Sequence, residues 1–204
     1  MSTAPAQTER RASARERLLA AADELFYAEG VQTVGIDRII EHAGVAKASL
    51  YNLFGSKEEL VAAYLASRHD RTTSRLDEAI ERFDDPRQKV LAVFDAQAQQ
   101  FAQPDFHGCA FISASAEAPR GGLVEHAADE FRASIRAMFT ELAEQAGVAD
   151  PIALGRQLHL LYDGAGLAAR MDHRDPTIAP SARVAAGALL DAAPTRRRQR
   201  STRK

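Results

Sequence analysis

A short stretch in the N-terminal third of the sequence carries side chains of the kinds that contact nucleic acids. The run KASLYNLF at residues 47–54 places Leu50, Leu53 and Phe54 on one side of a helix. The other side holds small, polar and aromatic residues, which can meet base edges and phosphates in the major groove of B-DNA. We interpret this face as a DNA-reading surface; the alternative is a face that is merely solvated, as on any amphipathic helix. The face comprises Lys47, Ala48, Ser49, Tyr51 and Asn52.

A second pair of residues suggests different chemistry. His107 and Cys109 are separated by one residue, as in a metal site or in a thiol nucleophile beside its base. Two ligands do not make a metal site, and no CxxC, HExxH or acid cluster accompanies them. We therefore expect no metal, no cofactor and no catalytic group. Cys109 is interpreted as a small core residue, with a redox- or electrophile-sensing role as the alternative.

The run GAGLAA at residues 164–169 matches the G-x-G-x-x-A pattern of dinucleotide-binding loops. That pattern requires a preceding strand within a βαβ unit, whereas helical periodicity continues through this run. We interpret it as a place of close helix packing. His159, one turn earlier, is interpreted as an interface residue, with a ligand contact as the alternative.

The elements that position residues 47–54 form a helix-turn-helix pattern. Apolar residues recur every three or four positions from Ile36 to Ala43, which predicts a helix over 36–43. Gly44 can adopt the left-handed conformation that ends a helix. A tight turn followed by a second short helix is the pattern of a DNA-reading motif.

Helices are also predicted on both sides of this motif. Ser13 and Glu16 form a capping box that begins a helix ending at Gly30. Ser56 begins a long helix that continues to the break at residues 84–86. The first helix and the two short ones together predict a three-helix head.

The composition indicates an all-α protein. Hydrophobic residues make up 46% of the 204 residues, which is enough for a substantial core. Aromatic residues are only 6%, and no β-branched alternation supports strands. One cysteine excludes an internal disulfide framework. Since no signal-peptide core and no run of 18 apolar residues appear, we expect a cytoplasmic protein without a membrane partner.

Charge is unevenly distributed along the chain. The last ten residues, TRRRQRSTRK, hold six of the 26 basic residues and no acid, so the rest has 20 basic and 28 acidic residues, a net charge of −8. Most of the body therefore repels a polyanion, and attraction is confined to the N-terminal arm, Lys47, Lys57 and this tail. We expect local, sequence-selective binding. The tail is either a solvated end or an extension that touches DNA.

The run AGVAKASLYNLFGSKEEL at residues 43–60 resembles the TetR family of transcriptional repressors, whose pattern is A-G-V-S-K-x-T-L-Y-x-H-F-x-S-K-E-E-L. The resemblance is close over residues 13–60, and the run DGAGLAAR at 163–170 is similar to a late family motif. It departs at Ala46, where Ser is common and would cap the helix, and at Leu53, where His or Tyr is usual. Val34-Gly35 also replaces a common Thr-Ser. The expected DNA contacts are Thr33, Gly35, Lys47, Ala48, Ser49, Tyr51, Asn52 and Lys57.

The resemblance implies a homodimeric regulator, most simply a repressor, that leaves palindromic double-stranded operator DNA when a small effector binds. The alternative is a helical scaffold or an enzyme in which the helix-turn-helix serves only packing. We predict an all-α fold, with an N-terminal three-helix helix-turn-helix head and a C-terminal helical bundle for effector binding and dimerisation. The expected divisions are a disordered basic arm (1–12), the DNA-binding domain (13–56), the effector-binding and dimerisation domain (57–193) and a disordered basic tail (194–204).

Two sets of residues in the body are candidates for these further roles. Aromatic residues gather near helix breaks, where a bundle can leave a cavity for a mainly apolar molecule. The last two helices mix large and small apolar residues, and the family's counterpart of this pair meets its twin in a four-helix bundle. The expected effector pocket comprises Phe94, Phe101, Phe106, Cys109, Phe111, Phe139 and Tyr162, and the expected dimer interface comprises Leu158, His159, Ala165, Ala169, Val184 and Leu189.

Overall fold

The computed structural model describes residues 12–172 and 175–196, which contain nine α-helices and no strand beyond an isolated bridge. The all-α prediction is confirmed. The chain divides into two compact units, unit 1 (Met1–Tyr64) and unit 2 (Leu65–Lys204), with the division inside the long helix α4 (Lys57–Ile80). No helix among the described residues has the length and apolarity needed to cross a bilayer. The predicted arm at 1–12, apart from Ala12, and the predicted tail at 194–204, apart from residues 194–196, lie outside the described residues. Residues 194–196 were predicted to be disordered, but they are held by backbone hydrogen bonds.

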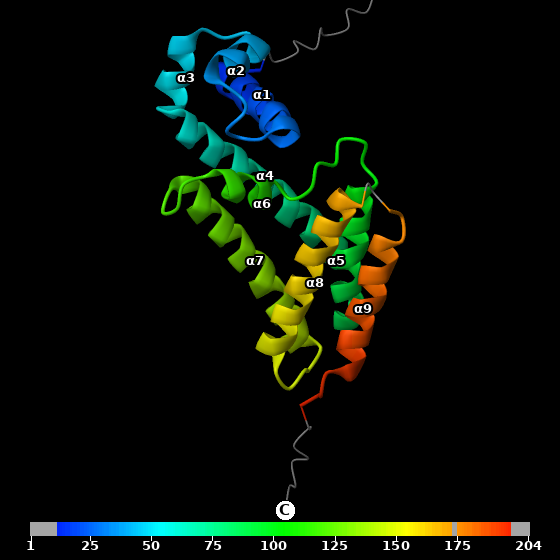
Figure 1. Cartoon of the computed structure of the whole chain (residues 1–204). Helices are drawn as coiled ribbons and strands as arrows, with labels where there is room; N and C mark the ends of the chain where they lie inside the picture. Colours follow the sequence, from blue (N-terminus) through cyan, green and yellow to red (C-terminus); the bar gives the residue numbers. More distant parts are fainter. Residues whose placement is uncertain (1–11, 173–174, 197–204) are drawn as a thin grey trace, which may run out of the picture. The chain divides into compact units, whose positions relative to one another are not determined.

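Unit 1 contains α1 (Ala14–Glu29), α2 (Ile36–Ala43), α3 (Lys47–Phe54) and the first two turns of α4 (Figure 1). The bounds of α2 and α3 are those predicted from the hydrophobic period. The predicted capping box at α1 is also present: Glu16 N–H donates to Ser13 Oγ at 3.2 Å, and Ser13 N–H donates to Glu16 Oε2 at 2.7 Å. Two orphan amides of the first turn are thereby satisfied.

The turn between α2 and α3 depends on Gly44, whose φ of 61° lies in the left-handed region. Arg17 Nε donates to the Ala43 carbonyl at 3.1 Å, so α1 satisfies an acceptor at the end of α2. Apolar side chains from all three helices close the core of the unit. Its buried members include Leu18, Phe26, Ile39, Leu50 and Phe54.

Unit 2 contains the rest of α4 and five further helices (Figure 1). Helix α5 packs along α9, and α8 packs against both α7 and α9. Helix α6, which packs on α7, was not predicted because it is short and its N-cap, Cys109, forms no side-chain cap. The helices are α5 (Pro86–Phe101), α6 (Ala110–Glu117), α7 (Leu123–Gln145), α8 (Pro151–Met171) and α9 (Ile178–Ala192).

Helices α7 and α8 cross at very short range. A Cβ atom on Gly155 of α8 would lie 2.4 Å from Thr140 Oγ1 and 2.9 Å from the backbone nitrogen of Thr140 on α7. No side chain fits in that space without displacing backbone. Gly155 is therefore required for the crossing, which the sequence pattern did not indicate.

The segment after α9 is fixed to the turn between α7 and α8. Val148 and Thr195 form an antiparallel bridge. Ala149 N–H donates to the Pro194 carbonyl at 2.7 Å, and Arg196 N–H donates to the Gly147 carbonyl at 2.8 Å. We call this arrangement the C-terminal clasp.

Candidate DNA-reading surface and effector site

The outward face of α3 is uncovered. Tyr51 is 45% exposed, Asn52, Lys47 and Ala48 are also exposed, and Ser49 is half-buried. These five residues therefore share one accessible face, as the amphipathic pattern predicted. The remaining predicted contacts flank it: Thr33 and Gly35 are exposed before α2, and Lys57, whose ammonium lies 3.5 Å from the Gln32 carbonyl, is half-buried.

Leu53 differs from the sequence expectation. It was assigned to the inward, apolar side of α3, but it is 41% exposed. The reason is geometric: in a helix of two turns, Leu50 and Phe54 are one turn apart and fill the buried stripe, which leaves Leu53 at its edge. The exposed face thus includes an apolar side chain.

The cations near this surface form ion pairs with acids of unit 1. Lys47 Nζ lies 2.8 Å from Asp37 Oδ1, and this carboxylate raises the pKa of Lys47. Arg38 Nη2 donates to Glu29 at 2.7 Å. Because both members of the Lys47 pair are exposed, a phosphate can compete for the ammonium. The sequence analysis did not identify Asp37 as the partner of Lys47. The signal was its position on the exposed side of α2, the helix that precedes α3.

In unit 2, some of the aromatic residues predicted for the effector pocket lie together. Phe94 of α5, Phe139 of α7 and Tyr162 of α8 form a triangle with ring centroids 5.8, 6.3 and 6.0 Å apart. Cys109 is close enough to Tyr162 to influence its ionisation. Burial is the main cause that raises the pKa of both the Tyr162 phenol and the Cys109 thiol. Both groups are therefore protonated near neutral pH.

The other predicted pocket residues form two separate contacts. Phe101 packs on Phe106 with centroids 5.1 Å apart. Phe111 stacks on Phe131 at 3.9 Å, and His69 meets the edge of both rings. These rings contribute to the core of unit 2.

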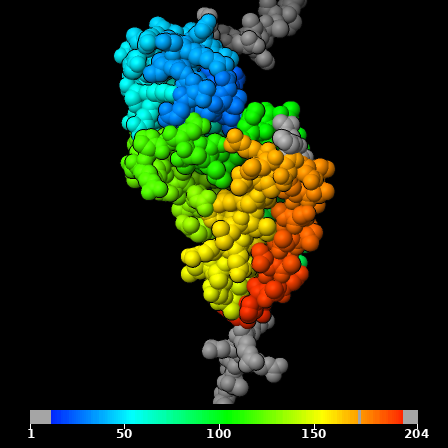
Figure 2. All heavy atoms as spheres, viewed as in Figure 1, coloured from blue at the N-terminus to red at the C-terminus, as the bar shows by residue number. Residues whose placement is uncertain are grey.

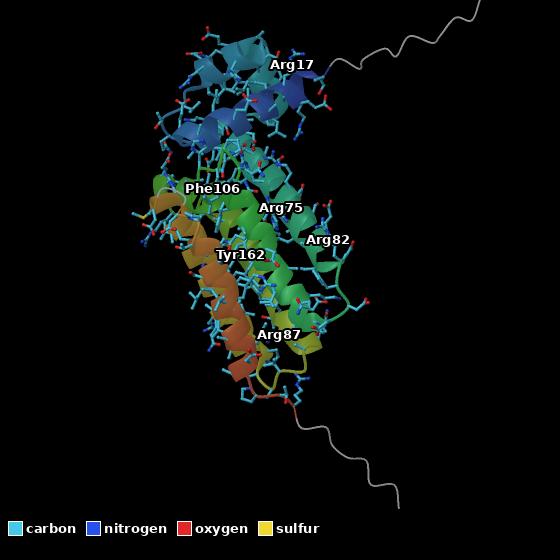
Figure 3. All side chains as sticks on the ribbon, turned by 90° about the vertical axis from the view of Figure 1, so that its right-hand side faces the viewer. Arg17, Arg75, Arg82, Arg87, Phe106 and Tyr162 are labelled. Carbon is cyan, nitrogen blue, oxygen red and sulfur yellow. The ribbon has the colours of Figure 1, made fainter. Side chains whose placement is uncertain are left out.

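A group of polar side chains that the sequence did not reveal adjoins Tyr162. Arg75 of α4 lies beside the Tyr162 hydroxyl and donates through Nη1 to Gln100 Oε1 of α5 (Figure 3). Gln97 Nε2 donates to the Tyr162 carbonyl at 2.8 Å in a buried position. A sequence signal existed: the apolar stripe of α4 is interrupted between Leu65 and Leu76.

A second polar group is centred on Asp163 of α8. Arg132 Nη1 lies 2.6 Å from Asp163 Oδ2, and His159 Nε2 lies 3.4 Å from the same oxygen. His159 is only 3% exposed, and burial lowers its pKa although Asp163 opposes this. The ring is therefore mainly neutral at neutral pH.

The face of α8 that points away from the unit differs from the predicted one. Four of the residues predicted for the dimer interface are buried against their own unit and offer no surface to a partner: Leu158, His159, Ala165 and Ala169. The reason is that the larger apolar stripe of α8 serves the core. Val184 on α9 is 72% exposed, as an interface residue requires, and Leu189 is half-buried.

The outward face of α8 carries large apolar side chains of its own. Ile152, Leu160, Leu167 and Met171 are all strongly exposed, and they recur at helical spacing. Figure 2 shows that the surfaces of α8 (yellow to orange) and α9 (orange to red) adjoin, and α9 carries the exposed Val184. A groove of about 500 Å³ between α7 and α8, lined in part by Ile152, extends this surface. We call the surface that carries Ile152, Leu160, Leu167, Met171 and Val184 the α8–α9 face.

A short helix with an uncovered polar face, joined to the preceding helix by a left-handed glycine turn, defines a helix-turn-helix protein with an additional helical body. Residues 18–64 match the family model of bacterial regulatory proteins of the tetR family. The crystal structure of a TetR-family transcriptional regulator from Streptomyces coelicolor superposes with a TM-score of 0.82 and 34% identity, over 87% of this chain and 94% of that one. The chain belongs to the TetR family.

Curated relatives match over part of the chain. The HTH-type transcriptional activator FasR of Mycolicibacterium smegmatis is 39% identical over 82 residues, which is 40% of this chain and 37% of the relative. The HTH-type transcriptional repressor NemR of Escherichia coli is 31% identical over 105 residues, 50% of this chain and 53% of the relative. The chain thus spans about a third to a half of the length of these relatives. Both relatives are described as transcriptional regulators.

Proposed function

We propose that the protein is a sequence-specific regulator of transcription that reads operator DNA with α3. The observation that carries this proposal is the exposure of Lys47, Tyr51 and Asn52 on a single face of that helix. Side chains of these types donate to phosphates and to base edges in the major groove. The small residues Ala48 and Ser49 allow the backbone to approach the bases.

We further infer that two copies associate through the α8–α9 face and bind a palindromic site. The exposed apolar residues Leu160, Met171 and Val184 support this arrangement, because water contact with such a surface is unfavourable. A twofold axis gives each copy one half-site, and the two reading helices then lie about 34 Å apart, one DNA turn. The α8–α9 face replaces the interface residues expected from the sequence, apart from Val184 and Leu189.

The direction of regulation is proposed as repression. Among the relatives, FasR is described as an activator and NemR as a repressor, so relatedness alone leaves both directions open. Occupation of an operator is sufficient to block transcription, whereas activation requires an additional surface that contacts the transcription machinery. Repression therefore needs no feature beyond those described.

Release of the operator is proposed to follow binding of a small, mainly apolar molecule near the Phe94, Phe139 and Tyr162 triangle. An effector shifts the equilibrium only if its affinity differs between the DNA-binding state and the released state. Helix α4 supplies residues to both units, so a displacement of α4 in unit 2 would also act on unit 1. This continuity supports α4 as the element that carries the change.

The test is selection of DNA fragments by the full chain. Fragmented genomic DNA is incubated with the purified protein, and the bound fragments are sequenced. We expect enrichment of short palindromes, and Tyr51→Ala should weaken binding to them by about 1–3 kcal/mol without changing the melting temperature. Lys47→Ala should flatten the dependence of log affinity on log salt by about one unit if the contact is a phosphate. Arg82→Ala, at an exposed position outside unit 1, is the control.

Three outcomes are distinguished by this experiment. Enrichment of a palindrome that both variants bind poorly supports the regulator. Binding without sequence preference contradicts it and favours a helical scaffold that uses the motif for packing. A palindrome that Tyr51→Ala binds as well as the wild type contradicts the assignment of α3 as the reading helix.

A further inference from the structure

Arg75 is a cation in unit 2 without a counter-charge. Its guanidinium has no Asp or Glu oxygen within 4.0 Å among the described residues, whereas Arg87, Arg132 and Arg183 of the same unit each form an ion pair. Arginine remains protonated inside proteins. A positive charge that is partly removed from water and lacks a carboxylate is unfavourable unless a ligand supplies the negative charge.

The hydrogen-bonding capacity of Arg75 is also incompletely used. Nη1 donates to the neutral amide oxygen of Gln100, and the side chain reaches the neutral hydroxyl of Tyr162. Nε is sealed from solvent and has no acceptor, and it is the only such buried side-chain N or O atom in the described part of the chain. A buried donor without an acceptor costs free energy, so the site favours an additional acceptor.

The acid that follows Tyr162 in the sequence is already engaged. Asp163, next to Tyr162 on α8, binds Arg132 Nη1 at 2.6 Å and faces His159 Nε2 at 3.4 Å. Its charge is thus compensated by Arg132 and not by Arg75. None of the residues that the structure describes provides an anion for Arg75 in this arrangement.

The surroundings of Arg75 include an apolar surface on one side. Tyr162, which the guanidinium reaches, packs edge-on against Phe94 and Phe139, and all three rings are buried. Gln97 holds the backbone of Tyr162 in place through its 2.8 Å hydrogen bond. A cation at the border of an aromatic group suits a molecule with one charged end and an apolar body.

We propose that Arg75 anchors the carboxylate of an effector whose body is apolar, such as an aryl or alkyl carboxylic acid. This inference rests on the proposed function, since the ligand is the molecule that releases the operator. The planar guanidinium fork matches a carboxylate, which replaces Gln100 Oε1 as the acceptor and also reaches Nε. A phosphate monoester fits less well because its second negative charge would need a second cation.

Binding in this mode would change the contacts of α4. Gln100 Oε1 is displaced, so the link between α4 and α5 through Arg75 is exchanged for a link through the ligand. The carboxylate thus acts on the helix that supplies residues to both units. An uncharged amide of the same shape cannot replace the charge-assisted hydrogen bond.

The test compares acids with their primary amides. The melting temperature of the full chain is measured with 2-naphthoate and octanoate and with 2-naphthamide and octanamide. We expect at least one of the acids, and neither amide, to raise it. In Arg75→Met the affinity for that acid should fall about tenfold or more, Arg75→Lys should retain part of it, and Arg82→Met should behave as the wild type.

A second measurement separates an anchor from a structural role and needs no ligand. If Arg75 served mainly to join α4 to Gln100 and Tyr162, Arg75→Met would lower the melting temperature of the ligand-free chain. Because its charge is uncompensated, we expect Arg75→Met to be as stable as the wild type or more stable. A clearly lower melting temperature of ligand-free Arg75→Met overturns the proposal. It is also overturned if neither acid raises the melting temperature of the wild type, or if an acid and its amide raise it equally.

Failure of the proposed function would look different. The selected palindrome is incubated with the chain and each acid, and the complex is followed by gel shift. Acid binding that depends on Arg75 but leaves the DNA complex intact supports the anchor and contradicts its role as the effector site. Loss of sequence preference in the DNA selection contradicts the regulator and leaves the melting-temperature result as it stands.

Discussion

At the scale of single residues, the Lys47–Asp37 pair places a carboxylate at the edge of the proposed reading surface. The two side chains are 2.8 Å apart and both are exposed. A DNA phosphate that binds Lys47 must compete with Asp37, and Asp37 also repels that phosphate. Asp37 thus lowers the affinity for DNA of any sequence. Tight binding then requires additional contacts with the bases, which makes binding more selective for sequence.

Replacement of this acid should strengthen DNA binding. We expect Asp37→Asn to bind the operator several-fold more tightly at low salt and to keep a salt slope near that of the wild type, because Lys47 contacts the phosphate in both proteins and only the competing carboxylate is removed. Fluorescence anisotropy across a salt series measures both quantities.

The control is Asp129→Asn on α7, which makes the same change in net charge at an exposed position in unit 2. It should leave affinity and slope near the wild-type values. If Asp37→Asn and Asp129→Asn have equal effects, only net charge matters and Lys47 is not a phosphate contact.

At the scale of helices, α3 lacks a side-chain cap. Ala46 occupies the N-cap position with φ −73° and ψ 148°, the extended conformation in which Ser or Thr normally caps, but it provides no acceptor. Ala46→Ser should therefore stabilise unit 1 by about 1 kcal/mol. Urea unfolding followed by circular dichroism measures the change. Ala48→Ser inside the same helix cannot cap and should be neutral or slightly destabilising, so equal gains in both variants would exclude the capping explanation.

The crossing of α7 and α8 provides a second prediction at this scale. Gly155→Ala places a methyl group against the backbone of Thr140 and should destabilise unit 2 by about 1–3 kcal/mol. At Gly187 of α9 an added Cβ would make only ordinary contacts, with Arg87 Nη2 at 3.6 Å and Leu91 Cδ2 at 4.0 Å, so Gly187→Ala should stabilise by about 0.5–1 kcal/mol. Thermal unfolding of the two variants should shift in opposite directions. A neutral Gly155→Ala would mean that the helices can separate without cost.

Hydrophobic period and caps were sufficient to predict helices whose signals are local. The bounds of α2 and α3 follow from the stripe that begins at Ile36 and the glycine turn at Gly44, and α1 follows from the Ser13 box. Features that depend on contacts distant in sequence could not be predicted this way. The close approach at Gly155 and the polar group around Arg75 arise from packing between helices, and no local pattern specifies the partner.

The choice of face on α8 shows the same limit. Both sides of this helix carry apolar residues, with Leu158 on one and Leu160 on the other. Periodicity identifies the stripes but not which one meets the chain's own core. In the candidate reading surface this ambiguity was smaller, because residues 47–54 have one strongly apolar side, and only Leu53 at its edge was assigned to the wrong face.

At the scale of the whole molecule, association through the α8–α9 face can be tested by one charged substitution. Leu160 lies near the middle of α8 and is 63% exposed. Its replacement should therefore leave the core of unit 2 intact. Leu160→Glu should give a folded monomer in sedimentation velocity, because a charge at a closely packed twofold interface faces its own copy. Affinity for the palindrome should fall together with dimerisation.

A charge at an apolar position outside this face serves as the comparison. Phe83, 40% exposed in the turn after α4, is suitable, and Phe83→Glu should remain dimeric. A Leu160→Glu protein that sediments as a dimer would place the contact elsewhere, whereas two monomeric variants would indicate general loss of structure.

The C-terminal clasp has a practical consequence for anyone handling this protein. A shortened version that stops before Pro194 would lose two backbone hydrogen bonds and would uncover Val148, which is otherwise almost wholly buried. Purification tags and fluorophores appended after the clasp begin beside the loop that joins α7 to α8. Trimming the basic residues to study their effect on DNA should therefore keep the chain through Arg196.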